Sequence, residues 1–341
     1  MTIPAKNTSQ RDVRLLGALR RAGLIGKPES ARFEALTGGV SSDIWKVTTA
    51  DRTFCVKRAL AKLKVAADWS APVERNHYEV AWSRIAHAIV PGAAPEILYH
   101  DEAEMFCAMS FLDPGDHRLW KSELRDGRAD PADAGEVGHR LGCIHAATAN
   151  NSQVAARFPR HDIFQAIRLE PYLEATAAVH PDLRDALFAL SRRTSATRMV
   201  MIHGDVSPKN ILLGPDGPVF LDAECACMGD PAFDLAFCLN HLLLKCLWNR
   251  PARSSFEACF EAMTDRYLAK VDWEPADAIE RRAASLLPGL LLARVDGKSP
   301  VEYLQTDTDR TLVRHCARAL LKSSPSRLSY VLAAWRKELD K

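Results

Sequence analysis

The stretch HGDVSPKNILL, residues 203–213, decides how the surrounding chain is expected to fold. An apolar run over residues 199–202 leads into it, and its own last three residues are apolar again, so the polar centre predicts a tight loop between two short strands. The Pro-Asp-Gly turn at residues 215–217 then reverses the chain into a hairpin whose returning strand ends at Asp222. The loop and the end of the hairpin are therefore expected to lie side by side.

Three oxygen-bearing side chains of this segment, Asp205, Asn210 and Asp222, are expected to converge. Phosphoryl transfer needs a carboxylate that accepts or orients the attacking hydroxyl, and hard oxygen ligands that hold Mg²⁺ against the phosphates. Asp205 fits the first role, and Asn210 and Asp222 fit the second. Taken singly, an Asp or Asn in such a loop is more often a turn residue, but the joint spacing favours a catalytic site.

The same residues resemble a known motif. The aminoglycoside phosphotransferase and choline kinase superfamily, which is related to protein kinases, carries H-G-D-x-x-x-x-N followed by a further Asp, and here these are residues 203–205, Asn210 and Asp222. The resemblance implies a bilobal α+β fold. Its small antiparallel-sheet N-lobe is expected over residues 1–112, and its larger, mostly helical C-lobe over residues 113–341. It also implies ATP and Mg²⁺ as cofactors and a small-molecule hydroxyl as phosphate acceptor.

Two acidic residues downstream extend this motif. Asp222-Ala223-Glu224 is similar to the D-x-E of methylthioribose kinases, which implies that Glu224 is another Mg²⁺ ligand; a surface Glu is the alternative. Asp234, just inside a helix that begins near Pro231, resembles the buried Asp with which the family pins its catalytic loop through backbone N–H groups. His203 is expected to support the loop through hydrogen bonds rather than to transfer protons.

The segment TGGVSSD, residues 37–43, lies between two predicted strands and supplies candidate phosphate-binding groups. Glycine lets the backbone approach phosphate, and serine hydroxyl and N–H groups donate to it. Gly38, Gly39, Ser41 and Ser42 are therefore expected to bind ATP. An ordinary hairpin turn is the alternative.

Lys57 ends an alternating strand over residues 53–57 and is the candidate partner of the α- and β-phosphates. Its carboxylate partner is expected on the helix predicted over residues 72–90, with Glu79 as first choice and Glu74 as rival.

The strand predicted over residues 105–111 should run into the linker between the lobes. By the resemblance, backbone groups from Ser110 to Leu112 would bind the adenine edge; a buried edge strand is the alternative.

The acceptor is predicted less sharply than the chemistry. Residues 57–79 resemble the corresponding stretch of methylthioribose kinases, which favours a sugar or polyol over a choline-like amino alcohol, and both over an aminoglycoside. Residues 207–209 depart from those enzymes.

Arg294, in a charged turn after an apolar helix, is expected to contact the substrate, with Lys298 a weaker candidate. A cationic helix C-terminus is the alternative.

Composition limits the partners of the 341-residue chain. A net charge of +2 favours neither nucleic acid nor membrane as a partner. The C-terminal part from residue 240 carries 17 Lys and Arg against 13 Asp and Glu, which suits an anionic or neutral substrate better than a polycation. Nine scattered cysteines and a polar N-terminus predict a cytoplasmic protein, either monomer or homodimer.

Two other functions remain to be weighed. A protein kinase is disfavoured because few residues separate Asp222 from the helix near Pro231, which leaves no room for a long activation segment. A catalytically silent nucleotide-binding regulatory module is the non-enzyme alternative.

Apolar periodicity predicts the remaining elements. The strands expected in the N-lobe cover residues 32–36, 44–49, 53–57, 96–100 and 105–111. The helices expected elsewhere cover residues 11–25, 132–149, 161–175, 181–193, 231–249, 254–270, 275–294 and 307–321.

Overall fold

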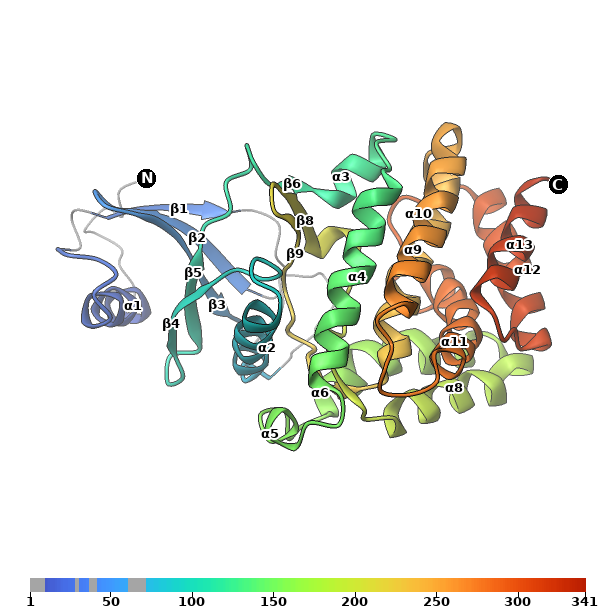
Figure 1. The fold of residues 1–341 in the computed structure, drawn as a ribbon, viewed down its shortest axis with the longest axis horizontal. Coiled ribbons are helices and arrows are strands. Elements are labelled where there is room, and N and C mark those ends of the chain that lie inside the picture. The colour runs from blue at the N-terminus through green and yellow to red at the C-terminus, as the bar shows by residue number, and fades with distance from the viewer. Residues whose placement is uncertain (1–9, 28–30, 37–41, 61–71) are drawn as a thin grey trace.

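The computed structural model describes residues 10–27, 31–36, 42–60 and 72–341. It shows a mixed α+β fold, in which an antiparallel five-stranded sheet lies toward the N-terminus and helices make up most of the remainder (Figure 1). This confirms the predicted fold class. Among the described residues, no helix combines the length and apolar character needed to cross a lipid bilayer.

The N-terminal sheet has the strand order β1-β2-β3-β5-β4, and every neighbouring pair is antiparallel. The predicted meander of the first three strands is confirmed, because each pairs with the next along the chain. The strands are β1 (Arg32–Leu36), β2 (Ser42–Thr48), β3 (Thr53–Ala59), β4 (Ile97–Asp101) and β5 (Phe106–Ser110).

The two faces of β3 serve different purposes. Successive side chains of a strand point to opposite faces, so Phe54 and Val56 enter a small core with Leu15 and Leu19 of α1 (Gln10–Arg21). Lys57 faces the other way, toward α2 (Arg75–Ile89). The alternation of side chains along β3 therefore points Lys57 away from the core that α1 covers.

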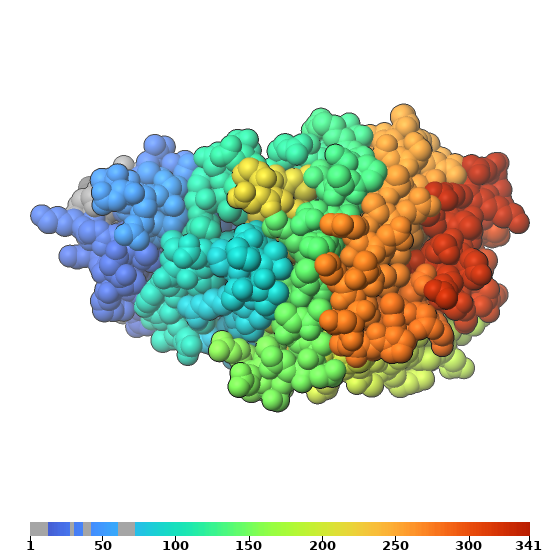
Figure 2. Space-filling view, in the orientation of Figure 1, coloured from blue at the N-terminus to red at the C-terminus, as the bar shows by residue number. Residues whose placement is uncertain are grey.

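Helix α2 joins the sheet to the helical part of the molecule. Its Tyr78, Trp82 and Ala86 belong to the large core of the C-terminal helices, although α2 also contacts β3, β4 and β5. Figure 2 shows α2, in cyan, against α4, in green, where the two parts of the molecule meet.

The C-terminal part contains helices and two small sheets. The helices are α3 (Trp120–Arg125), α4 (Pro131–Thr148), α5 (Ser152–Ala155), α6 (Asp162–Phe164), η2 (Gln165–Glu174), α7 (Ala175–Val179), η3 (Pro181–Leu183), α8 (Arg184–Ala196), η4 (Pro208–Asn210), α9 (Pro231–Trp248), η5 (Arg250–Ala252), α10 (Arg253–Leu268), α11 (Ala276–Asp296), α12 (Asp307–Ser323) and α13 (Leu328–Leu339). One sheet joins β6 (Arg118–Leu119), β8 (Ile211–Gly214) and β9 (Gly217–Phe220), and the other joins β7 (Val200–Ile202) and β10 (Cys227–Gly229).

The single helix predicted over residues 161–175 is wrong in detail. The structure has a short α6, a π-helical segment η2 and then α7. Pro171 lies inside η2, and proline lacks the N–H that an α-helix would use at that position. The wider π-helical turn accommodates it. The sequence also gave no prediction for α3, α5, α13, β6 and β10.

Helix α9 lies at the centre of the helical part, with α10 and α11 packed against it (Figure 1). Every residue from Pro231 to Leu247 is buried. A helix that is apolar all round is expected to be buried, so the polar residues that interrupt α9, among them Asp234 and Lys245, stand out.

Helices α4 and α10 approach each other closely enough to require glycine. A Cβ added to Gly138 would lie 2.3 Å from the carbonyl oxygen of Met263, a backbone atom that has no freedom to turn away. At Gly135, one turn earlier, the nearest atom is Cγ of Arg266 at 3.2 Å, on a flexible side chain.

We expect Gly138→Ala to lower the free energy of unfolding by about 1–3 kcal/mol, because overpacking costs more than the gain in helix propensity. Gly135→Ala is the matched control and should be neutral or slightly stabilising. Urea denaturation of both variants checks this. Equal stability of the two variants would show that α4 and α10 do not depend on close backbone contact.

Candidate active site

Lys57 is the point where the N-terminal sheet meets the loop that follows β9. Its Nζ lies 2.7 Å from Oε1 of Glu79 on α2, 2.5 Å from Oδ1 of Asp222 and 3.3 Å from Oε1 of Glu224. The expected partner Glu79 is thus the one that pairs with Lys57, and the rival Glu74 lies at the start of α2. One ammonium group is shared by three carboxylates from distant parts of the sequence.

These three carboxylates form a group able to hold a metal ion. One oxygen of each of Glu79, Asp222 and Glu224 lies within 4.8 Å of the others. Carboxylate oxygens are the ligands that Mg²⁺ prefers, so the donor set fits this ion. Glu79 lies together with Asp222 and Glu224, two members of the predicted set of metal ligands. Asn210, the third predicted ligand, donates its amide nitrogen to Asp205, and its role as a ligand stays a prediction.

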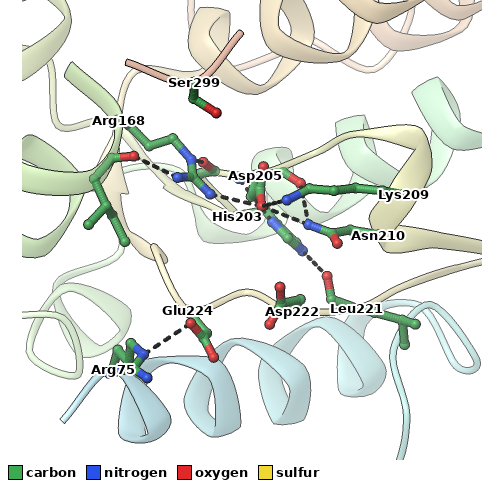
Figure 3. A network of polar contacts seen from close by, with 12 residues as sticks. Arg75, Arg168, His203, Asp205, Lys209, Asn210, Leu221, Asp222, Glu224 and Ser299 are labelled. Carbon is green, nitrogen blue, oxygen red and sulfur yellow. Dashed lines mark hydrogen bonds and ion pairs between the residues drawn. The ribbon is translucent and has the colours of Figure 1, made fainter. Parts of the chain in front are cut away.

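Glu224 is buried, so the alternative of a surface glutamate is wrong. It accepts a hydrogen bond from the Ser42 hydroxyl at 3.0 Å and pairs with Nε of Arg75 at 3.0 Å (Figure 3). Arg75 is fully buried and also donates to the carbonyl of Leu60 at 2.7 Å. Nothing in the spacing of the sequence singled out Arg75, because its partner lies 149 residues away.

Burial and mutual repulsion shape the protonation of this group. The pKa of Glu79 is raised to about 7, mainly by burial; Asp222 and Glu224 contribute to this rise, and Lys57 opposes it. Burial alone would also raise the pKa of Asp222, but the ammonium groups of Lys57 and Lys209 hold it below its usual value. At Lys57 the three carboxylates raise the pKa more than burial lowers it, so this pKa lies well above its usual value. Glu79 thus takes up a proton before Asp222 does.

The predicted catalytic carboxylate, Asp205, is buried and surrounded by donors. Its Oδ2 lies 2.8 Å from Nη2 of Arg168, 3.2 Å from Nζ of Lys209 and 2.8 Å from Nδ2 of Asn210 (Figure 3). Asn210 uses its amide nitrogen here, which leaves Oδ1 as the only metal-ligating atom that it can offer. Arg168 lies on η2 and was not predicted from the sequence.

A second carboxylate holds the loop in place, as the sequence led us to expect. Asp234 on α9 accepts hydrogen bonds from the backbone N–H of His203 at 2.7 Å and of Gly204 at 2.8 Å. Gly204 has a φ of 75°, and an added Cβ would lie 2.7 Å from Cβ of Cys225, so no other residue fits. The loop conformation is therefore fixed by α9 from behind.

His203 supports the loop, as predicted. Its Nδ1 accepts from the N–H of Asp205 at 3.1 Å, and its Nε2 donates to the carbonyl of Leu221 at 3.0 Å. Burial lowers the pKa of His203, which keeps the ring neutral as this pairing requires. The ring also meets Trp82 edge to face at 4.7 Å. His203 thereby ties the Asp205 loop to the backbone just before Asp222.

Asp222 was predicted to end the returning strand of the hairpin, and the structure differs. Strand β9 stops at Phe220, and Asp222 lies beyond it in a left-handed conformation with a φ of 68°. Aspartate tolerates this conformation better than most residues. The turn of the chain at this point places Asp222 against Lys57.

The predicted nucleotide-binding residues of the sheet are only partly described. Gly38, Gly39 and Ser41 lie outside the described residues, whereas Ser42 is buried at the start of β2. Ser110 ends β5, and its N–H donates to the carbonyl of Glu96 at 2.9 Å.

That amide is therefore engaged within the protein, and binding of the adenine edge by the backbone from Ser110 to Leu112 stays a prediction. Leu112 follows the strand and is half-buried.

The two predicted substrate-binding cations of the late helices differ in their surroundings. Arg294 is buried, and its Nη1 donates to the hydroxyl of Tyr172 at 3.1 Å and to Oγ of Ser299 at 3.0 Å. Lys298 is exposed and pairs with Glu170 at 2.5 Å. The helix-end alternative also holds, because Gly297 caps α11.

Arg168 should control the acidity of Asp205. Burial raises the pKa of Asp205, but Arg168 and Lys209 lower it further than burial raises it, so the carboxylate stays ionised until the pH falls below its usual range. Removing one nearby cation typically shifts such a pKa by about 1–3 units. We expect Arg168→Met to move the acid limb of the kcat/KM profile upward by about that amount.

Arg160→Met is the control for that profile, since Arg160 forms an exposed pair with Asp162 just before α6. An acid limb at the same pH in wild type and Arg168→Met would contradict the assigned role of Arg168.

Asp234→Ala should lower the free energy of unfolding by about 2–6 kcal/mol, since it leaves two buried N–H groups without an acceptor and each costs about 1–3 kcal/mol. Asp272→Ala, at an exposed position, should change it by less than about 0.5 kcal/mol. Urea denaturation measures both. A similar small effect of both changes would show that the loop holds its shape without Asp234.

Comparison with known proteins agrees with this geometry. Methylthioribose kinase of Pectobacterium carotovorum subsp. carotovorum (strain PC1) is 26% identical over 256 residues, which covers 66% of this chain and 63% of that enzyme. The chain thus spans less than two thirds of that relative. Methylthioribose kinase of Yersinia pseudotuberculosis serotype O:3 (strain YPIII) is 23% identical over 359 residues, which covers 89% of this chain and 88% of that enzyme.

Two solved structures share the fold. Plasmodium vivax ethanolamine kinase superposes with a TM-score of 0.57 at 14% identity, covering 95% of this chain and 94% of that chain. Choline kinase from Cryptosporidium parvum Iowa II gives a TM-score of 0.56 at 14% identity, covering 94% and 99%. A family model described as "Phosphotransferase enzyme family" matches residues 32–258. The chain belongs to the phosphotransferase enzyme family.

Proposed function

We propose that the chain is an ATP- and Mg²⁺-dependent kinase that transfers the γ-phosphoryl group to a hydroxyl of a small molecule. The convergence of Lys57 with Asp222 and Glu224, next to the loop that carries Asp205, is the observation that supports this most strongly. A lysine for phosphates, oxygen ligands for a cation and a carboxylate for the acceptor are the parts that phosphoryl transfer requires. The family to which the chain belongs supports the same chemistry.

Asp205 orients the acceptor in this mechanism. Its carboxylate accepts the hydrogen of the attacking hydroxyl and turns the oxygen lone pair toward the γ-phosphorus, in line with the leaving group. Arg168 and Lys209 keep it ionised but also reduce its basicity. A weak base suffices, because the acceptor oxygen loses its proton late in a loose transition state.

Lys57 and the acidic residues provide the nucleotide end. Lys57 would exchange contacts with carboxylates for the α- and β-phosphates while Glu79 holds it in position. Asp222 and Glu224, with Oδ1 of Asn210 available beside them, are the residues that would hold Mg²⁺. The bound ion supplies positive charge that offsets the charge of the phosphates. The oxygen-rich donor set around Lys57 supports this role.

A sugar or polyol is the proposed acceptor class, because the relatives reported above are named methylthioribose kinases. Amino alcohols and aminoglycosides are less suited, since two cations, Arg168 and Lys209, already lie against Asp205. A cytoplasmic monomer or homodimer acting on a small molecule, without nucleic-acid or membrane partners, remains a prediction.

We expect Asp205→Asn to lower kcat by about 10²–10⁴-fold, the usual contribution of a positioned acid–base group. The KM for ATP should change little, because Asp205 faces the acceptor. Asp216→Asn, in the exposed turn between β8 and β9, is the matched control and should behave like wild type. Activity is measured as phosphoryl gain by mass spectrometry across a metabolite panel with ATP and Mg²⁺.

Equal turnover by wild type and Asp205→Asn would overturn the proposal. Thermal stabilisation of the wild type by ATP and Mg²⁺, with no acceptor phosphorylated in the panel, would instead favour a silent nucleotide-binding module.

A further inference from the structure

One face of α9 continues from the catalytic loop into a group of cations. Phe237, His241 and Lys245 follow one another at a spacing of four residues, so they lie on one side of the helix. The Phe237 ring contacts the guanidinium of Arg168, which itself binds Asp205, at 5.8 Å. The His241 ring meets Phe237 edge to face at 5.6 Å. This face therefore leads from Asp205 toward Lys245.

Lys245 is buried among aromatic rings. Its side chain is 1% exposed, and its Nζ lies 4.3 Å from the ring centre of Trp248 and 4.9 Å from that of Tyr303. The two rings stack on each other at 4.5 Å. Lys245 forms no hydrogen bond or ion pair with any other residue that the structure describes.

Arg294 of α11 has the same shortage of carboxylate partners. It is nine-tenths buried, and its guanidinium lies over the ring of Tyr172 at 5.6 Å. Nη1 is satisfied by Tyr172 and Ser299, but Nε is buried with no partner. Tyr172 in turn packs on Phe237 at 5.4 Å, which connects Arg294 to the same face of α9.

The neighbouring cations are neutralised within the protein, whereas these two are not. Arg168 and Lys209 bind Asp205, and Lys121 binds Glu302. Within the described part of the chain, no carboxylate lies within ion-pair distance of Lys245 or Arg294. Lys245 and Arg294 are therefore buried donors without a carboxylate partner among the described residues, and an oxyanion from outside would supply that partner.

We propose that Lys245 and Arg294, with His241 between the catalytic loop and Lys245, form a subsite for an oxyanion, either carboxylate or phosphate, carried by the acceptor. The inference rests on the proposed kinase function and specifies its substrate class. The acceptor would be a hydroxy acid or a phosphorylated polyol, with its hydroxyl at Asp205 and its anionic end at Lys245. A cationic acceptor would be repelled at the same place.

The protonation of Lys245 is consistent with a site that awaits an anion. Burial lowers its pKa to about 7; Lys121 of α3 and Arg294 of α11 lower it too, while Glu302 and Cys238 raise it. The other titratable groups near it are Tyr303, whose pKa burial raises, and His241, whose pKa burial and the surrounding cations lower. A bound oxyanion favours protonated Lys245, so its binding weakens as the pH rises above about 7.

The experiment compares acceptors of equal carbon number whose terminal group is either anionic or neutral: aldonic acids, sugar phosphates and polyols. The wild type should show at least about tenfold higher kcat/KM for one anionic class, and the preferred class identifies carboxylate or phosphate. Lys245→Met and Arg294→Met should remove the preference, mainly through KM, and Lys245→Arg should restore it. The KM of the wild type for the acid should rise above pH 7, and that of Lys245→Met should not.

Lys337→Met, at an exposed position of α13, is the matched control and should keep the wild-type preference. The same acids are also titrated calorimetrically into protein saturated with ADP and Mg²⁺, which requires no turnover. Binding that Lys245→Met abolishes supports the subsite even if no acceptor is phosphorylated, and the kinase proposal alone then fails.

Turnover of neutral acceptors as efficiently as of anionic ones, unaffected by Lys245→Met, would overturn the subsite and leave the kinase function standing. If no anion is either phosphorylated or bound, both the subsite and the kinase function are overturned.

Discussion

The ammonium group of Lys57 is the contact on which the site depends, because it joins elements that have no covalent reason to meet. It comes from a strand of the sheet, one of its partners from α2, and the other two from the loop after β9. Five ionic groups, three acidic and two basic, are packed here with Arg75 included. Such a group is stable only while every charge has a partner, so the two parts of the molecule are held in a defined relation by electrostatics.

The loop that carries Asp205 follows a different principle, since most of the contacts that hold it are made to its backbone groups. Asp234 binds two amides, and His203 bridges the backbone on either side of it. Arg168 acts on both the acidity and the shape of the loop: its Nη2 pairs with the Asp205 carboxylate, and its Nε donates to the carbonyl of Gly204 at 2.7 Å. Geometry and acidity are therefore coupled through this residue.

Much of this could be predicted from the sequence, because several of the site residues belong to local motifs. The motif at residues 203–213 fixes its own hairpin, and the alternation in β3 places Lys57 on the face away from α1. The support from Asp234 followed from the motif that it accompanies. What failed were contacts between side chains remote in sequence: Arg75 with Glu224 and Arg168 with Asp205 carry no periodic signal.

Local exceptions were the second source of error. Pro171 converts a predicted α-helix into a π-helical segment, and a single left-handed residue, Asp222, ends the strand early. Neither departure follows from hydrophobic periodicity, which averages over several residues. The acidic group also includes Glu79, which was predicted only as the partner of Lys57.

Helix α9 carries Asp234 near its first turn and Lys245 near its last, about 16 Å apart along one rigid axis. The end that supports the reaction and the end that would meet the acceptor are therefore separated by buried apolar turns that transmit little beyond the direction of the axis. In the proposed kinase, substitutions at the far end would alter which molecule is accepted without disturbing the loop that carries Asp205. A scaffold divided in this way can diversify its substrates over evolutionary time at little risk to catalysis.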